Sequence, residues 1–293
     1  MRKIIVGASL LVMTICNAQI GIGTNTPDPS AALEVQSTTK GFLPPRMTET
    51  QMSAISAPAE GLMVYCTNCS PKGLYIFDGF VFNNTAGTAS VGTPSVTGAG
   101  GAVWMDRNLG ATQVATSSTD YLAYGNLYQW GRTSDGHEVI NWTSSTTSDN
   151  AEQSNETAGP VASGAEGTNF ITVPSQQDWL TVQDDARWDG ANKGVHDPCP
   201  TNFRVPTIAE WDAERLSWSS NNSSGAFASP LKLTLASSRL INGELFFPSF
   251  VAYYWSSTVS GNNARHLSFN TTSAELNSFA RAHGTPIRCI RTY

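Results

Sequence analysis

The segment Arg204-Val205-Pro206-Thr207-Ile208-Ala209-Glu210-Trp211 carries the strongest local signal in this chain of 293 residues. Thr207 stands three residues before Glu210, which is the spacing of a capping box, in which the hydroxyl accepts from a backbone N–H and the carboxylate reaches back. Pro206 disfavours a helical conformation of the residue before it. The segment therefore predicts a helix that begins near residue 207, with Trp211 and Leu216 toward the core.

A second segment, Val173-Pro174-Ser175-Gln176-Gln177-Asp178-Trp179, repeats this pattern. Ser175 and Asp178 have the same capping-box spacing, so we expect another helix to begin near residue 175, with Trp179 and Val182 toward the core. The flanking sequences do not match. We interpret the repeated pattern as two similar helix starts and not as a duplicated domain.

After Pro230 short apolar runs alternate with turn residues, which predicts a series of short strands. The runs are residues 231–235, 244–247, 253–255, 266–269 and 287–290. All eight tryptophans lie between Trp104 and Trp255. This aromatic content predicts a substantial core for one domain over residues 103–293.

Four segments of this domain occur together in a known family. They are VWMDRNLG (103–110), YGNLYQWGR (124–132), DPCP (197–200) with FRVPTIAEW (203–211), and YWSS (254–257) with PIRCIR (286–291). Together they resemble the major paralogous domain family of Fibrobacter succinogenes. That family is similar to the fold of C-type lectins and formylglycine-generating enzymes. The resemblance implies an α+β, C-type-lectin-like domain, with two helices around a short twisted antiparallel sheet and long loops, preceded by a small β-rich module.

Residues 19–84 consist of short apolar pieces separated by Gly and Pro, which indicates brief strands and turns. Residues 48–55 can form one or two helical turns capped by Thr48 with Gln51, and residues 61–65 and 73–79 predict a hairpin. The pieces IGT (22–24), GFLPPRM (41–47) and GLMVY (61–65) resemble an N-terminal module of secreted Bacteroidetes proteins. The resemblance implies a surface or fibre context and a homo-oligomeric, trimeric stalk. Residues 85–102, rich in Gly, Ser and Thr, are predicted to be a linker with a strand that leads into the next domain.

The N-terminus has the pattern of a signal peptide over residues 1–18. Arg2 and Lys3 precede an apolar stretch, and Ala18 supplies the small residue before a cleavage site at Gln19. A lipoprotein anchored through Cys16 is the alternative. No later apolar stretch is long enough for a membrane helix. We therefore expect an exported protein at the cell surface or outside the cell, with the periplasm as the alternative.

Four cysteines remain after this cleavage: Cys66, Cys69, Cys199 and Cys289. An even number in an oxidising compartment predicts two disulfides. A reactive Cys-x-x-Cys pair normally opens a helix, whereas Cys66 and Cys69 follow a predicted strand, which favours a structural bridge. The family resemblance implies a bridge between Cys199 and Cys289, which would close a loop of about 90 residues and stabilise the fold by about 4 kcal/mol.

Several classes of function find no support in the sequence. The net charge is -6 and no basic run occurs, which argues against nucleic-acid binding. The four histidines lack the spacing of metal ligands, and no nucleophile elbow, phosphate loop or dinucleotide motif is present. We predict no enzyme and no cofactor, with calcium held by carbonyl, Asp and Asn oxygens as an alternative. An enzyme of the formylglycine-generating kind would need a free Cys199 or Cys289.

Two C-terminal segments, residues 261–266 and 270–281, are the predicted ligand-binding loops, because their Asn, Ser, Thr, Arg and His side chains offer adaptable hydrogen bonding. Ordinary solvated loops are the alternative. The function predicted is a non-catalytic adhesion or binding protein with a glycan or protein ligand; a structural envelope or matrix component without a ligand is the alternative. The candidate ligand-binding residues are Asn262, Asn263, Arg265, His266, Asn270, Asn277 and Arg281.

Overall fold

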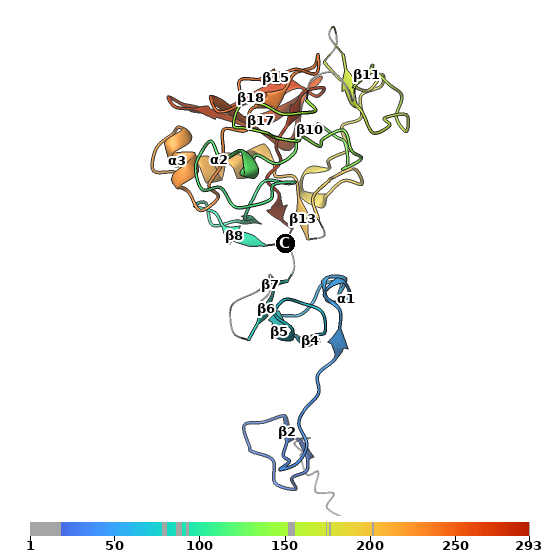
Figure 1. Cartoon of the computed structure of the whole chain (residues 1–293), viewed down its shortest axis with the longest axis vertical. Helices are drawn as coiled ribbons and strands as arrows, with labels where there is room; N and C mark the ends of the chain where they lie inside the picture. Colours follow the sequence, from blue (N-terminus) through green and yellow to red (C-terminus); the bar gives the residue numbers. More distant parts are fainter. Residues whose placement is uncertain are drawn as a thin grey trace, which may run out of the picture.

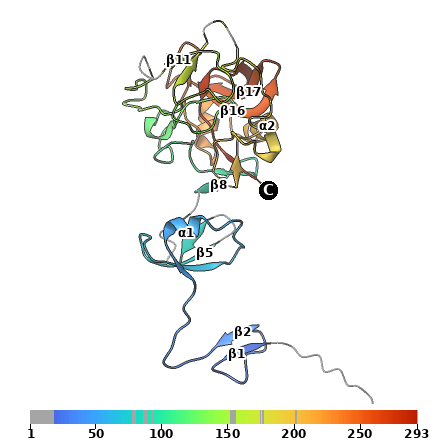
Figure 2. The ribbon, with the colours of Figure 1, turned by 90° about the vertical axis from the view of Figure 1, so that its right-hand side faces the viewer.

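The computed structural model describes residues 19–77, 81–85, 90–91, 94–151, 156–173, 175, 177–200 and 202–292. The predicted signal peptide and Cys16 lie outside the described residues. Two perpendicular views show an elongated molecule, with a small sheet at one end, a middle unit, and a large unit at the other end (Figures 1 and 2). No helix in the described ranges has the length and apolar character needed to cross a membrane.

The end sheet is formed by two short parallel strands, β1 (Ile20–Ile22) and β2 (Leu33–Val35). The middle unit is a five-stranded sheet in the order β3-β4-β5-β6-β7 with one short helix, α1. Its elements are β3 (Arg46–Met47), α1 (Glu49–Ser53), β4 (Met63–Cys66), β5 (Gly73–Phe77), β6 (Phe82–Asn84) and β7 (Ser90–Val91). The strand β7, which pairs with β6, lies within the range expected to be a linker.

Two local predictions for the middle unit are confirmed. Thr48 caps α1, and the Thr48 and Gln51 side chains form both halves of a capping box. The strands β4 and β5 form an antiparallel hairpin in which Val64 lies opposite Tyr75. The Cys66–Cys69 disulfide follows β4, with 5.7 Å between the two Cα atoms, beside a small core that includes Met52.

The large unit spans β8 to β20, and its described residues form four small sheets, two α-helices and two short 3-10 helices, Tyr121–Ala123 and Gly190–Asn192. One sheet has the order β13-β20-β9-β8 and another the order β10-β19-β14-β15, while β11 pairs with β12 and β16-β17-β18 form a meander. The strands are β8 (Ser95–Thr97), β9 (Val103–Met105), β10 (Tyr128–Gln129), β11 (Glu156–Ala158), β12 (Phe170–Thr172), β13 (Phe203–Arg204), β14 (Ser238–Arg239), β15 (Leu245–Phe246), β16 (Val251–Ser260), β17 (Asn263–Asn270), β18 (Ala274–Ala280), β19 (Gly284–Thr285) and β20 (Ile290–Arg291). The helices are α2 (Ile208–Leu216) and α3 (Ser223–Ala228).

The helix expected near residue 207 is present as α2. Thr207 and Glu210 form the predicted capping box, and Arg204 donates to both carboxylate oxygens of Glu210. Burial favours a higher pKa for Glu210, but the hydrogen bonds from Arg204 and Thr207 outweigh it and lower that pKa. Trp211 is fully buried as predicted, whereas Leu216 is 69% exposed because it lies on the solvent side at the helix end.

The α+β, C-type-lectin-like fold class is wrong. The described part of the chain is mostly β, with several small sheets instead of one sheet between two helices. No helix forms at residues 175 and 177–180: the Asp178 side chain accepts from the Leu180 N–H, and Leu180 pairs with Val161. A local Asx turn and a tertiary strand contact therefore compete successfully with helix initiation.

The runs predicted to be strands after Pro230 are only partly strands. Residues 244–247, 253–255 and 266–269 contain or lie within β15, β16 and β17. Residues 231–235 form no strand, and the run 287–290 contributes only Ile290 to β20. The difference arises because Leu231, Leu233 and Leu235 are buried as an irregular segment in the main core.

The four motif segments of the sequence meet in the core of the large unit. The indole N–H of Trp255 donates to the Tyr128 carbonyl, and that of Trp211 donates to the Trp255 carbonyl. The guanidinium of Arg288 donates twice to the Asn108 side-chain oxygen. These indole and guanidinium groups are buried, so each hydrogen bond gives a partner to a polar group that could not be hydrated by solvent.

The disulfide between Cys199 and Cys289 is present, with 5.9 Å between the Cα atoms and a separation of 90 residues. Both predicted disulfides are therefore confirmed. The Cys199–Cys289 bridge joins the loop before β13 to the chain just before β20, and β20 lies between β13 and β9 in one sheet. The end of the chain is thus held both covalently and by strand pairing.

Candidate functional site

The meander β16-β17-β18 has one face against the main core, whereas its other face packs on a second core cluster around Trp255 at one end and is exposed around Glu275 and Asn277. Residues that lie opposite each other in register share a face, so Trp255, His266 and Asn277 form one row across the three strands. Tyr253, Ser268 and Glu275 form the next row. The other face carries Tyr254 and Leu267 into the main core with Trp211 of α2. We call the face with the two rows the outer face.

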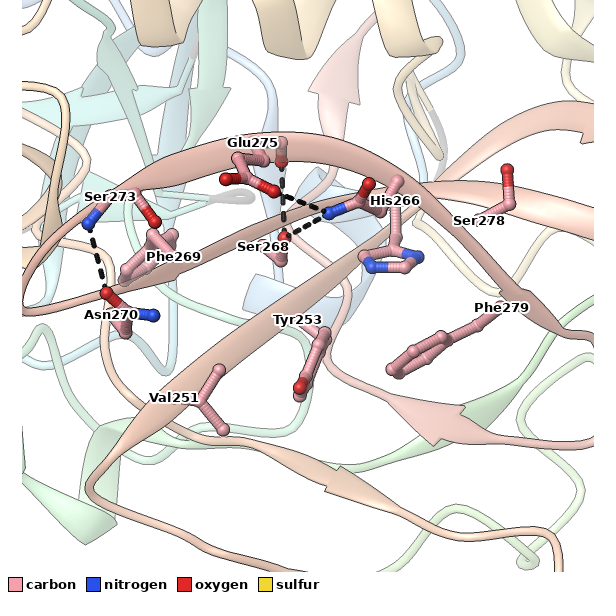
Figure 3. A pocket seen from close by; sticks show the side chains of 11 residues that line it. Val251, Tyr253, His266, Ser268, Phe269, Asn270, Ser273, Glu275, Ser278 and Phe279 are labelled. Carbon is pink, nitrogen blue, oxygen red and sulfur yellow. Dashed lines mark hydrogen bonds between the residues drawn. The ribbon is translucent and has the colours of Figure 1, made fainter.

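A pocket of about 360 Å³ lies on the outer face. The rings of Tyr253, His266 and Phe279 lie together, whereas Ser268, Asn270, Ser273 and Glu275 lie toward the other end with Phe269 among them (Figure 3). None of the lining residues is a lysine or an arginine. The lining residues are Val251, Tyr253, His266, Ser268, Phe269, Asn270, Ser273, Glu275, Asn277, Ser278 and Phe279.

The polar side of the pocket is a hydrogen-bonded strip. The Asn277 amide donates to Ser268 Oγ and to Glu275 Oε2, each at 3.2 Å (Figure 3). Ser268 donates to the Glu275 carbonyl at 3.4 Å. The side-chain oxygen of Asn277 and the second carboxylate oxygen of Glu275 take no part in this strip. They are free to accept hydrogen bonds at the surface, because both residues are exposed.

The aromatic side of the pocket surrounds His266. Its ring centroid is 4.3 Å from that of Phe279 and 5.4 Å from that of Tyr253. The side chain has no solvent-exposed surface, and within the described part of the chain neither ring nitrogen has a hydrogen-bond partner. Burial, with the nearby His283 and Arg265, lowers the pKa of His266 to about 3. The ring is therefore neutral at physiological pH, with one donor and one acceptor unused.

Three of the seven predicted ligand-binding residues lie on the outer face. His266 and Asn277 are the two just described, and Asn270 lies at the end of β17. The Asn270 side-chain oxygen accepts from the backbone of Thr272 and Ser273, so it shapes the turn into β18. Its oxygen thus has a structural role, whereas its amide nitrogen remains at the pocket edge.

The other four predicted residues lie elsewhere. Asn262 is in the turn between β16 and β17, and Asn263 is the first residue of β17. Arg265 is on the core-side face and donates to the Leu276 carbonyl. Arg281 is fully buried, donates to Asp185 at 2.6 Å, and lies 4.5 Å from the ring centroid of Trp130. Its contacts are those of a residue that holds the fold together.

The segments expected to be ligand loops are mainly strands. Residues 263–266 belong to β17, and most of residues 270–281 belong to β18. This prediction was wrong because polar side chains on an outward face lower the apparent β-propensity of a strand. The signal that could have indicated a strand is an alternation along this segment: Glu275, Asn277 and Phe279 lie on one face, and Ala274 and Leu276 lie on the other. The same alternation would have found Tyr253, Ser268, Glu275 and Phe279, which are four of the eight pocket residues that were not predicted.

One further cluster has the composition of a metal site. Ligand atoms of Asp135, His137 and Glu138 lie within 4.8 Å of one another. His137 Nε2 accepts from the Gln129 N–H at 3.0 Å, and Nδ1 lies 2.6 Å from Asp135. Arg132 makes an ion pair with the same carboxylate. Because protein groups already use both ring nitrogens, the cluster acts as a polar link that fixes residues 129–138.

The state of the cysteines is relevant to the alternative that this protein is an enzyme of the formylglycine-generating kind, which would need a free thiol. Cys199 and Cys289 form a disulfide, so neither offers a free thiol in this structure. Cys66 and Cys69 are bonded to each other in the same way. A formylglycine-generating activity through Cys199 or Cys289, which the sequence left as an alternative, therefore gains no support from them.

The end sheet exposes an unusual amount of apolar surface. In the parallel register Ile20 lies opposite Leu33 and Ile22 lies opposite Val35, which places all four side chains on one face. They are 58%, 53%, 55% and 42% exposed, respectively. Small soluble monomers rarely leave such a contiguous aliphatic face uncovered. The face has the properties of an interaction surface.

Residues 21–99 match a family described as a phage tail like trimerisation region. The match covers the end sheet from Gly21 onward and the whole middle unit. This part of the chain is thus similar to a trimerisation region, and homo-oligomerisation is supported. No curated protein and no solved structure matches the chain.

Proposed function

We propose that this protein is an exported, fibre-like homotrimer in which the end sheet and middle unit form the stalk and the large unit is displayed at its end. The observation that carries the proposal is the aliphatic face of the end sheet inside a region similar to a trimerisation region. The elongated arrangement of the three parts is compatible with a stalk and a head (Figure 1).

The partner of the aliphatic face is two further copies of this chain. A two-stranded sheet is marginally stable by itself in water. Packing Ile20, Ile22, Leu33 and Val35 from three copies around one axis would remove these side chains from water. It would also give each end sheet the hydrophobic core that it lacks.

Export is part of this proposal, supported by the signal-peptide pattern of residues 1–18 and by the two disulfides, which suit an oxidising compartment. We also propose that residues 103–293 belong to the Fibrobacter succinogenes major paralogous domain family. Support comes from the meeting of its four motif segments in one core, through contacts such as Trp255 to Tyr128 and Arg288 to Asn108.

The molar mass of residues 19–293 in solution tests the trimer, measured by light scattering after gel filtration. We expect three times the chain mass for the wild type and the mass of one chain for Ile22→Asp/Leu33→Asp, because the two carboxylates would be buried against apolar neighbours. The matched control is Val182→Asp/Val195→Asp, which changes two exposed valines of the large unit and should remain trimeric. A monomeric wild type, or a double variant that stays trimeric, would contradict the proposal.

A further inference from the structure

The unused hydrogen-bonding groups of His266 indicate what the outer-face pocket accepts. A neutral imidazole offers one N–H donor and one acceptor nitrogen, and buried groups of this kind without partners are costly. A hydroxyl group also offers one donor and one acceptor. It therefore matches the imidazole at either nitrogen, whereas a carboxylate or phosphate only accepts and an ammonium only donates.

Aromatic rings cover the imidazole of His266. Phe279 lies against the imidazole, and its other neighbours are Tyr253, at 4.6 Å between ring centroids, and His283, at 4.6 Å. Phe279 is partly buried and packs against a second core cluster of the large unit. A ligand that reaches the imidazole would have to displace the Phe279 ring, and Tyr253 and Phe279 would then lie beside it as flat walls.

The charge of the pocket narrows the ligand class further. Glu275 is its only acidic residue, His266 is neutral, and no cation lines it. Acidic ligands would approach Glu275 without a compensating charge. Next to the aromatic walls, Asn277 and Glu275 present amide and carboxylate oxygens that can accept from neighbouring hydroxyl groups. A pocket with apolar walls and few convergent polar groups is typical of a small-molecule site.

We propose that the outer-face pocket binds a neutral carbohydrate, with its hydroxyl groups on His266, Asn277 and Glu275 and its C–H face against Tyr253 and Phe279. The inference rests on the proposed function, because it makes the displayed large unit the part that binds. It assigns the site to a strand face and not to the loops at the ends of the sheet.

Saturation-transfer NMR and calorimetry with residues 19–293 test this site. The probes are the neutral trisaccharides maltotriose, cellotriose and chitotriose, with choline and 3′-sialyllactose as a cation and an acidic sugar. We expect saturation transfer to at least one neutral trisaccharide. The Kd for that sugar should rise by about tenfold in Asn277→Ala and in His266→Phe, since each removes one or two hydrogen bonds.

Asn262→Ala is the matched control, because Asn262 is also an exposed asparagine but lies at the β16–β17 turn outside the pocket. Its Kd should stay within about twofold of the wild type. Asn277 is exposed, so its variant tests the pocket even if His266→Phe folds poorly. Three results would each overturn the site: no transfer to any neutral trisaccharide, transfer to choline or 3′-sialyllactose alone, or an unchanged Kd in Asn277→Ala.

The mass measurement keeps the two proposals separate. A trimer that binds no sugar would leave the stalk intact and remove the carbohydrate site. Sugar binding by a monomeric chain would support the carbohydrate site and contradict the trimeric stalk. Each result therefore removes one proposal without affecting the other.

Discussion

At the scale of single residues, the large unit buries polar side chains whose pKa values are strongly shifted. His137 and His266 are both buried, and burial is the main cause that lowers their pKa to about 4 and about 3. The two residues differ in their partners, because His137 is hydrogen-bonded on both sides and His266 on neither. The same residue type thus serves as a structural link in one place and as a candidate ligand contact in the other.

His266→Phe should reduce the acid sensitivity of the fold. The pKa of His266 is lowered to about 3 in the folded chain, while an unfolded histidine titrates near 6.5. Between these values the unfolded chain binds one more proton, so stability falls as the pH falls from about 6.5 toward 3. Tyr253 lies against the ring, and the nearby His283 and Arg265 both favour its neutral form, so these neighbours supply no negative charge at these pH values.

The measurement is the free energy of unfolding in urea at pH 7 and at pH 4.5, at one protein concentration. The wild type should lose roughly 2–3 kcal/mol more than the variant between the two values. Asn277→Ala, which changes the same face without a titratable group, should behave like the wild type. Equal losses in His266→Phe and the wild type would show that His266 is not held neutral.

At the scale of elements, local patterns hold where tertiary contacts agree with them. The capping boxes of α1 and α2 form as predicted, whereas the similar pattern at Ser175 and Asp178 does not produce a helix. Near Asp178, Trp179 is drawn into the core, where its indole donates to the Trp130 carbonyl and Arg187 lies 5.0 Å from its ring centroid. The burial of one large ring outweighs a cap, which stabilises a helix by only about 1 kcal/mol.

Asn108 connects the segment after β9 to the segment before β20, and Asn108→Ala should destabilise this link. Its oxygen accepts two hydrogen bonds from Arg288, which is fully buried and whose pKa is lowered to about 10 by burial. The other acceptors of this guanidinium are the carbonyls of Met105 and Leu231. Removal of the Asn108 side chain would leave a buried cation short of partners, at a cost of about 3–5 kcal/mol.

This cost is measured by unfolding the protein in urea and following the tryptophan fluorescence of the large unit. Asn242→Ala is the control, because Asn242 is exposed at the turn before β15 and its loss should change the unfolding free energy by less than about 0.5 kcal/mol. If Asn108→Ala were as stable as the control, the Arg288 guanidinium would have to be satisfied by the backbone carbonyls alone.

At the scale of the whole molecule, two disulfides of very different span secure two different units. Cys66–Cys69 closes a loop with a separation of 3 residues in the middle unit, and Cys199–Cys289 closes one of 90 residues in the large unit. The chain-entropy model makes the stabilisation increase with loop length. The long bridge also ties together β13 and β20, which come from distant parts of the chain.

Removal of the long disulfide should therefore lower the unfolding free energy more than removal of the short one. We expect Cys199→Ala/Cys289→Ala to lower the unfolding free energy of the large unit by about 4 kcal/mol, and Cys66→Ala/Cys69→Ala to lower that of the middle unit by about 2 kcal/mol. Calorimetry of both double variants at one protein concentration provides the comparison. A larger effect of the short bridge would contradict a loop-length origin of the stabilisation.

The sequence by itself determined the features that depend on a few neighbouring residues or on composition. The α1 and α2 capping boxes, the β4–β5 hairpin, the buried Trp211 and the presence of two disulfides all follow from local spacing or cysteine number. Such features are set within one helical turn or one hairpin, so distant residues do not need to be known.

Only the tertiary structure decided the fold class and the members of the site. The choice between helix and turn at Asp178 depends on where Trp179 and Leu180 pack. The outer-face pocket depends on the register that places His266 beside Asn277 and Trp255, from three different strands. A shift by one residue in one strand would turn that strand's side chains to the other face, and the sequence alone does not specify the register.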